Sequence, residues 1–135
     1  MPFAVVRDLQ MYYEIRGTGP RLLCISGTGG DLRRSPTIFD MFPALHFEIL
    51  AYDQRGLGQT SRPDMPYTMA DYADDANALL DAMGWERCLV VGISFGGMVA
   101  QEFALRYPHR VERLVLASTS SGVSGPGHNV LKSPF

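Results

Sequence analysis

The stretch Leu89-Val90-Val91-Gly92-Ile93-Ser94-Phe95-Gly96-Gly97 decides the fold of this 135-residue chain. Apolar residues typical of a strand lead directly into Gly92, and a helical pattern follows Gly97. A turn this sharp forces its central residue, Ser94, into sparsely populated backbone angles, at a cost of about 1–3 kcal/mol. Small residues two positions to either side remove side chains that would collide. The turn therefore predicts that Ser94 is a solvent-facing nucleophile, and that the backbone N–H of Phe95 donates to an oxyanion at the start of the helix.

Strand-like and helical patterns alternate on both sides of this turn. The helix from Gly97 to Tyr107 ends at Pro108, and the clearest helix runs from Met69 to Met83. Thr68 and Asp71 form a predicted capping box at its start, and Gly84 is a typical stop. The other predicted strands are 3–7 and 11–16, joined by a turn at 8–10, and then 21–25, 47–52, 87–91 and 113–118, with a short helix at 36–42.

This alternation predicts an α/β fold with a mostly parallel sheet that has helices on both faces and an antiparallel hairpin at one edge. An apolar content of 46% over 135 residues is enough for one domain with a buried core. Four Gly-rich or polar loops each follow a predicted strand, at 26–30, 53–61, 92–96 and 118–125. We therefore expect them to share one rim of the sheet, which is where such sheets bind ligands.

The loop Ser26-Gly27-Thr28-Gly29-Gly30 follows the strand expected to lie beside the Ser94 strand. It predicts a second oxyanion donor at the backbone N–H of Thr28, with Gly27 and Gly29 contacting substrate. A plain tight turn is the alternative. A phosphate-binding loop is disfavoured, because no lysine follows and the glycine spacing is wrong.

The loop Asp53-Gln54-Arg55-Gly56-Leu57-Gly58-Gln59-Thr60-Ser61 is interpreted as scaffold. We expect Asp53 and Arg55 to pair across a turn, while the glycines allow close backbone approach.

Composition excludes several classes of partner. A net charge of −2 with 19% charged residues gives no indication of a nucleic-acid partner, and no apolar run reaches the roughly 20 residues of a membrane span. The N-terminus lacks the features of a signal peptide, so a cytoplasmic location is expected. Cys24 and Cys88 lie in strand-like runs without metal-ligand spacing and are predicted to be buried and reduced, with a disulfide or a reactive thiol as the alternative. No metal or cofactor is expected.

Over residues 3 to about 120, the sequence resembles the N-terminal portion of the α/β-hydrolase superfamily. The stretches that carry the resemblance are 26–30, 53–58, 92–101 and 110–116. The likeness is greatest to small bacterial hydrolases related to 3-oxoadipate enol-lactonase, haloperoxidase-like esterases and carbon–carbon bond hydrolases. It implies that Ser94 sits on a nucleophile elbow, and that about six of eight strands are represented, with the lid and the last strands missing. Ser26 stands where the family usually has His, and a serine at position 94 argues against haloalkane dehalogenases and epoxide hydrolases, which have Asp there.

The remaining members of a catalytic triad are missing from the sequence. The family order is Ser, then an acid, then His, yet no Asp or Glu follows Glu112. His46 and His109 are interpreted as surface or structural residues. His128 lies in a Gly/Ser/Pro-rich segment, 121–135, which is expected to be an unstructured tail behind a truncated core, 1–120.

Three hypotheses follow. The first is a serine hydrolase of small esters, lactones or related acyl substrates, whose acid and histidine lie in sequence outside this chain. The second is a catalytically incomplete remnant or interaction module, which pairs with another chain or a second copy through an open sheet edge at the strand 113–118. The third is a tail that folds back so that His128 serves as the base.

Overall fold

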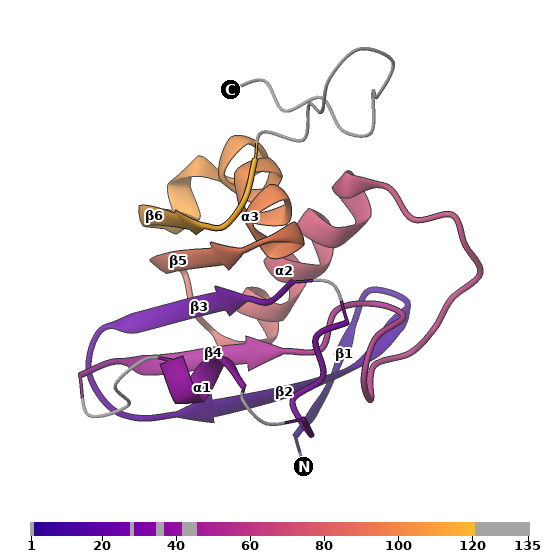
Figure 1. Ribbon diagram of the computed structural model, residues 1–135, viewed down its shortest axis with the longest axis horizontal. Coiled ribbons are helices and arrows are strands. Elements are labelled where there is room, and N and C mark those ends of the chain that lie inside the picture. The colour runs from indigo at the N-terminus through magenta and orange to yellow at the C-terminus, as the bar shows by residue number, and fades with distance from the viewer. Residues whose placement is uncertain (1, 28, 35–36, 42–45, 121–135) are drawn as a thin grey trace.

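The computed structural model describes residues 2–27, 29–34, 37–41 and 46–120 (Figure 1). Its strands are β1 (Phe3–Val6), β2 (Leu9–Arg16), β3 (Arg21–Ile25), β4 (Glu48–Tyr52), β5 (Cys88–Ile93) and β6 (Val111–Ala117). Its helices are α1 (Ile38–Met41), α2 (Met69–Met83) and α3 (Phe95–Arg106), with a 3₁₀ turn η1 at Pro108–Arg110. The expected tail, 121–135, and with it His128, lies outside the described residues.

All six strands join one sheet in the order β1-β2-β4-β3-β5-β6. Strands β4, β3, β5 and β6 are parallel neighbours, whereas β1 pairs with β2 and β2 with β4 in antiparallel fashion. The predicted α/β fold with a mostly parallel sheet and an antiparallel hairpin edge is confirmed. In this register Ile25 lies opposite Gly92, which brings the loop after β3 beside the turn after β5.

The hairpin turn differs from the prediction. The turn was expected at residues 8–10, but β2 already begins at Leu9, which pairs with Val6. The connection is therefore Arg7-Asp8, with Arg7 at φ 57°. Leu9 is 2% exposed and belongs to the core. Burial of this side chain therefore extends β2 into the segment 8–10, for which the local sequence predicts a turn.

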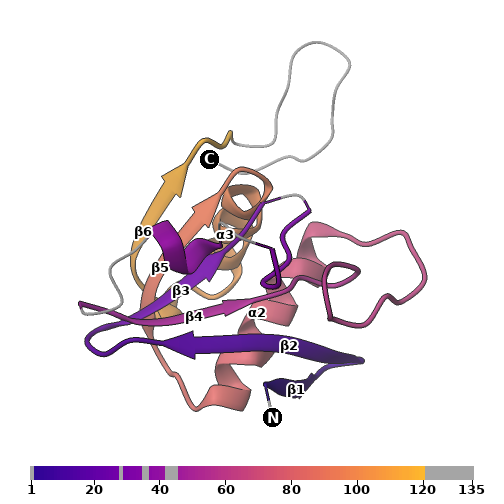
Figure 2. The same cartoon turned by 60° about the horizontal axis from the view of Figure 1, so that its bottom comes forward.

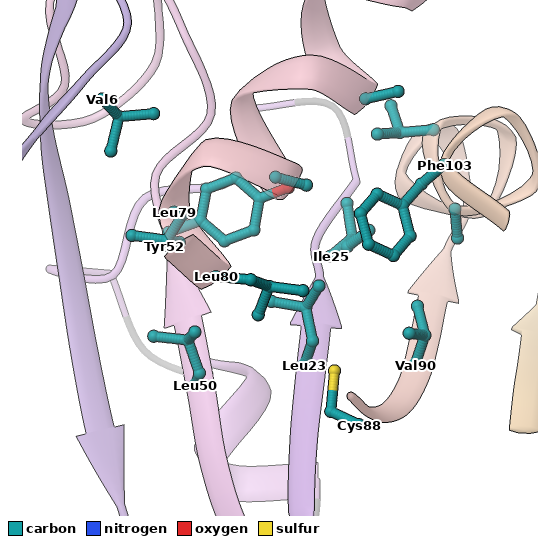
Figure 3. Close-up of a cluster of buried hydrophobic side chains, with 14 of the residues drawn as sticks. Val6, Leu23, Ile25, Leu50, Tyr52, Leu79, Leu80, Cys88, Val90 and Phe103 are labelled. Carbon is teal, nitrogen blue, oxygen red and sulfur yellow. The ribbon is translucent and has the colours of Figure 1, made fainter. Parts of the chain in front are cut away.

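Helices cover both faces of the sheet, as expected. Helices α2 and α3 pack on one face and the short α1 lies on the other (Figures 1 and 2). The larger core lies between the sheet and the α2/α3 pair (Figure 3), and its labelled members include Leu23, Leu50, Tyr52, Leu79, Leu80 and Phe103. The alternate strand residues point to the α1 face, where Leu22, Cys24, Ile49 and Ala51 pack with Phe39.

Helix α2 begins and ends where the sequence predicts. The Thr68 hydroxyl accepts from the backbone N–H of Asp71, and the Asp71 carboxylate accepts from the backbone N–H of Thr68. Gly84 ends the helix in the left-handed conformation, at φ 70°. No helix among the described residues is long and apolar enough to cross a membrane.

The two cysteines are buried and free, as predicted. Burial raises the pKa of Cys24 to about 12 and that of Cys88 to about 11, so both remain protonated thiols at neutral pH. Cys24 packs on the α1 face of the sheet and Cys88 on the α2/α3 face. The alternative of a disulfide between them is therefore wrong.

Candidate active site

Ser94 is held in the strained conformation that its surrounding sequence predicts. Its backbone lies at φ 56°, ψ −122°, directly between β5 and α3. The Ser94 N–H donates to the carbonyl of Ala117 at 2.9 Å, and the Thr119 hydroxyl donates to the Ser94 carbonyl at 2.6 Å. These bonds to the end of β6 fix the backbone, while the Ser94 side chain is exposed and does not cap the helix.

Two glycines allow the close packing of this turn. A methyl group on Gly92 would lie 2.5 Å from the Gly96 carbonyl oxygen and 2.6 Å from the Ala100 Cβ. A methyl group on Gly96 would overlap the Ile25 carbonyl and lie 2.5 Å from the Ser26 carbonyl oxygen. The first turn of α3 therefore packs directly against the end of β3. The helix begins at Phe95 rather than at the predicted Gly97, because β5 continues to Ile93 and Ser94 alone connects the two elements.

The Phe95 N–H is available to an anion. The first N–H groups of a helix have no partner within it, and no acceptor for this one is found in the described part of the chain. The positive end of the helix dipole lies at the same point. Thr28, predicted as the second donor, lies outside the described residues.

Gly27 and Gly29 flank that position. A methyl group on Gly27 would lie 3.1 Å from the Ser94 Cβ, so this glycine lies directly beside the serine. Gly29, at φ 75°, lines a neighbouring cavity. The structure thus brings the loop after β3 against Ser94, and contact of these glycines with substrate stays a prediction.

The loop after β4 holds both ends of the loop after β3. Gln54 Nε2 donates to the Ser26 carbonyl at 2.8 Å, and the Leu32 N–H donates to Asp53 Oδ1 at 2.9 Å. The other Asp53 oxygen accepts from the Gln59 N–H at 3.0 Å. Burial raises the pKa of Asp53, and the two backbone donors partly oppose that rise. These bonds give Asp53 and Gln54 a structural role, in line with the interpretation of this segment as scaffold.

The pairing of Asp53 with Arg55 is wrong. Both Asp53 oxygens already accept backbone N–H groups, and Arg55 instead reaches α2. There its Nε and Nη2 donate to the two carboxylate oxygens of Asp75 at 2.6 and 2.8 Å. These bonds raise the pKa of Arg55, so the buried guanidinium remains charged. Sequence reasoning missed Asp75, although an acidic residue within the apolar stripe of α2 was an available signal.

Two cavities meet at Phe95. One, of about 320 Å³, is lined by Ser94, Phe95, Met98 and residues 118–120 at the end of β6. The other, of about 460 Å³, lies over the loop after β4 and is bounded by Phe95 and Gly29.

No histidine in the described part of the chain lies near Ser94. His46 precedes β4 and His109 precedes β6, so both lie at the amino ends of parallel strands, whereas Ser94 lies at the carboxyl ends. The seven residues of β6 span about 23 Å, so neither imidazole reaches the serine. Within the described ranges, no group of three His, Cys, Asp or Glu side chains is placed to hold a metal ion.

Comparison with known proteins gives a consistent picture. Residues 20–131 match the model of a family described as alpha/beta hydrolase fold. A crystal structure of a hydrolase from Pseudomonas aeruginosa superposes with a TM-score of 0.82 at 38% identity, covering 92% of this chain and 47% of that chain. The enol-lactonase from Burkholderia xenovorans superposes with a TM-score of 0.82 at 30% identity, covering 91% of this chain and 48% of its own.

Curated relatives extend the comparison to named activities. The 2-hydroxymuconate semialdehyde hydrolase of Pseudomonas putida is 39% identical over 113 residues, covering 82% of this chain and 40% of that protein. The poly(3-hydroxyalkanoate) depolymerase of Ectopseudomonas oleovorans is 38% identical over 109 residues, covering 78% of this chain and 38% of that protein. The chain spans less than half the length of these relatives.

Proposed function

Since the chain belongs to the alpha/beta hydrolase fold family, we propose that it is the nucleophile-bearing part of a serine hydrolase of small esters, lactones or related acyl substrates. Ser94 attacks the substrate carbonyl, and the Phe95 N–H receives the developing oxyanion. Thr28 is the proposed second donor. No metal or cofactor enters this chemistry.

The observation that carries the proposal is the strained, exposed Ser94. A non-glycine residue at φ 56° costs about 1–3 kcal/mol, and the surrounding hydrogen bonds hold it there. The Ser94 hydroxyl itself makes no hydrogen bond within the described residues, so it contributes nothing to folding that would account for the strain. Presenting a nucleophile beside a free helix N–H does account for it.

The named activities of the relatives support the substrate class. A lactone, a polyester and a 2-hydroxymuconate semialdehyde all carry a carbonyl. Addition of a nucleophile to a carbonyl produces a tetrahedral oxyanion, which is the species that a backbone N–H at this position stabilises.

In this proposal the acid and the histidine base come from sequence outside this chain. A serine without a base is mostly protonated and reacts slowly. In the serine protease subtilisin, loss of the histidine costs about a millionfold in rate. The 320 Å³ cavity at Ser94 leaves room for an imidazole to approach the hydroxyl.

A fluorophosphonate reagent with intact-mass detection tests the proposal. We expect one adduct on the folded chain, at Ser94, which forms faster when imidazole in the buffer replaces the base. The adduct should be lost in Ser94→Ala and retained in Ser118→Ala, a matched change at an exposed serine lining the same cavity. If Ser94 reacts no faster than other serines even with imidazole present, the proposal is wrong.

The exposed edge of the sheet favours a second candidate function, an interaction module. In the described chain β6 pairs only with β5, and Val115 and Leu116 are 54% and 40% exposed. This edge is suited to pairing with a second copy or a complementing chain.

A further inference from the structure

The cavity of about 460 Å³ borders Phe95, the residue that directly follows Ser94. It is enclosed by the segment that runs from β4 to α2, by the first turns of α2 and α3, and by Gly29. Its lining includes Gly29, Leu57, Met65, Tyr67, Tyr72 and Phe95. A volume of this size and an apolar lining with few polar groups are typical of small-molecule sites.

A row of aromatic rings forms the wall that leads away from the serine. Phe95 contacts Tyr72 edge-on at a centroid distance of 5.2 Å, and Tyr72 contacts Tyr67 edge-on at 6.0 Å. The Tyr67 hydroxyl donates to the Pro63 carbonyl, which fixes the ring. The row is therefore a preformed apolar surface that begins at the residue after the nucleophile.

The charged residues of the lining do not make the cavity an anion site. The Arg55 guanidinium stacks over Tyr67 at 5.3 Å, and its charge is neutralised by the bidentate contact with Asp75. Asp8 also contacts Arg55, at 3.2 Å. Arg62 also lines the cavity and is exposed to solvent. The interior that remains is apolar.

We infer that this cavity binds an apolar arm of the substrate, an aryl group or a medium-length alkyl chain, whose carbonyl lies at Ser94. The inference rests on the proposed function, because Phe95 provides both the oxyanion N–H and the inner end of the aromatic wall. It predicts a hydrolase that prefers esters or lactones with a hexyl- or phenyl-sized group over acetyl-sized ones.

Binding is tested first in a protein that has no nucleophile. In Ser94→Ala, 1-hexanol should shift the backbone amide NMR signals of Gly29, Gly56 and Phe95 saturably. Leu57→Lys places a charge in the cavity and should weaken this binding at least about tenfold. Met65→Lys alters a lining residue that is 75% exposed, so we expect the variant to fold, and it should weaken binding in the same direction.

The matched control is Val5→Lys, an equally apolar residue that is 84% exposed on β1, away from the cavity; it should leave hexanol binding unchanged. If hexanol shifts none of the three amides, or if both cavity variants bind it like the control, the inference is wrong whether or not Ser94 reacts.

The second measurement connects the cavity to the serine. Hexyl fluorophosphonate should label Ser94 at least about tenfold faster than the ethyl analogue, and Leu57→Lys should abolish this preference. A preference that survives Leu57→Lys would overturn the inference while leaving the proposed function intact. Absence of labelling with both reagents, together with saturable hexanol binding, would instead overturn the proposed function alone.

Discussion

Gly96 is the residue at which α3 and β3 come closest. Its Cα faces the backbone carbonyls of Ile25 and Ser26. Unlike a side chain, these backbone atoms cannot change rotamer to make room for a Cβ. The same contact positions Ser94, since the helix that begins at Phe95 is held against the end of β3. A side chain at Gly96 would therefore displace the helix start from the loop that carries the predicted second oxyanion donor.

We predict that Gly96→Ala lowers the free energy of unfolding by about 1–3 kcal/mol, measured by urea denaturation. Alanine is the better helix former, so intrinsic propensity alone would raise stability by up to about 1 kcal/mol. The control is Gly84→Ala, where a methyl group meets no atom within 4 Å and only the strain at φ 70° is added. A Gly96→Ala protein as stable as the wild type would show that the close contact does not constrain the turn.

Helix α2 connects the scaffold loop to the first hairpin. Its Asp75 receives Arg55 from the loop after β4, and Arg7 Nη1 from the hairpin turn at 3.0 Å. At the N-terminus of α2, the capping box satisfies helix N–H groups and places the Asp71 carboxylate near the positive end of the dipole. The local sequence determines where the helix begins, while Asp75 determines which segments bind to it, namely those that carry Arg55 and Arg7.

The charge of Asp71 predicts a pH dependence of stability. The hydrogen bond from the Thr68 N–H holds the pKa of Asp71 below its ordinary value of 3.8. A carboxyl with a lowered pKa in the folded state stabilises the protein above that ordinary value, and the contribution is lost as the pH falls through the folded-state pKa. Asp71→Asn should therefore reduce the free energy of unfolding by about 0.3–1 kcal/mol at pH 7 and by progressively less below pH 4.

Denaturation curves between pH 7 and pH 2.5 measure this difference. Asp64→Asn, in an exposed loop segment, is the control and should have little effect at any pH. A difference between Asp71→Asn and the wild type that stayed constant across the range would assign the effect to something other than the carboxylate charge.

The whole sheet gives the site its location. Because β3, β4, β5 and β6 are parallel, the described loops that follow them meet at one rim, as the sequence predicts. The same arrangement leaves β6 as an edge strand of the described chain. An edge with exposed apolar side chains promotes pairing between copies.

We predict that the 135-residue chain associates in a concentration-dependent manner, measured by sedimentation velocity. Val115→Lys should weaken the association about tenfold, because a symmetric pairing of two β6 edges brings two lysines close together. The control Met65→Lys changes an exposed apolar residue outside the sheet and should leave association unchanged. A monomeric wild-type chain would remove the support for the interaction-module alternative.

The sequence by itself determined the order and type of the elements and the strained turn at Ser94. Helix α2 and strand β3 lie where predicted, and the other ends differ by up to two residues, as at the start of β2. These features follow from local signals, namely apolar period, capping residues and small residues around a sharp turn. The α/β class follows because alternating strands and helices have few ways to bury their apolar faces.

Only the tertiary structure decided the partners of the polar residues around the site. Arg55 pairs with Asp75, 20 positions away, and Gln54 holds Ser26, 28 positions away. Burial of Leu9 likewise moved the hairpin turn to Arg7-Asp8. Such contacts depend on the order of the strands in the sheet and on which buried donors still need an acceptor. The hydrophobic periodicity of a single segment contains neither kind of information. The Ser94 turn could be read from nine consecutive residues, whereas the scaffold and the cavity beside it exist only once the sheet has formed.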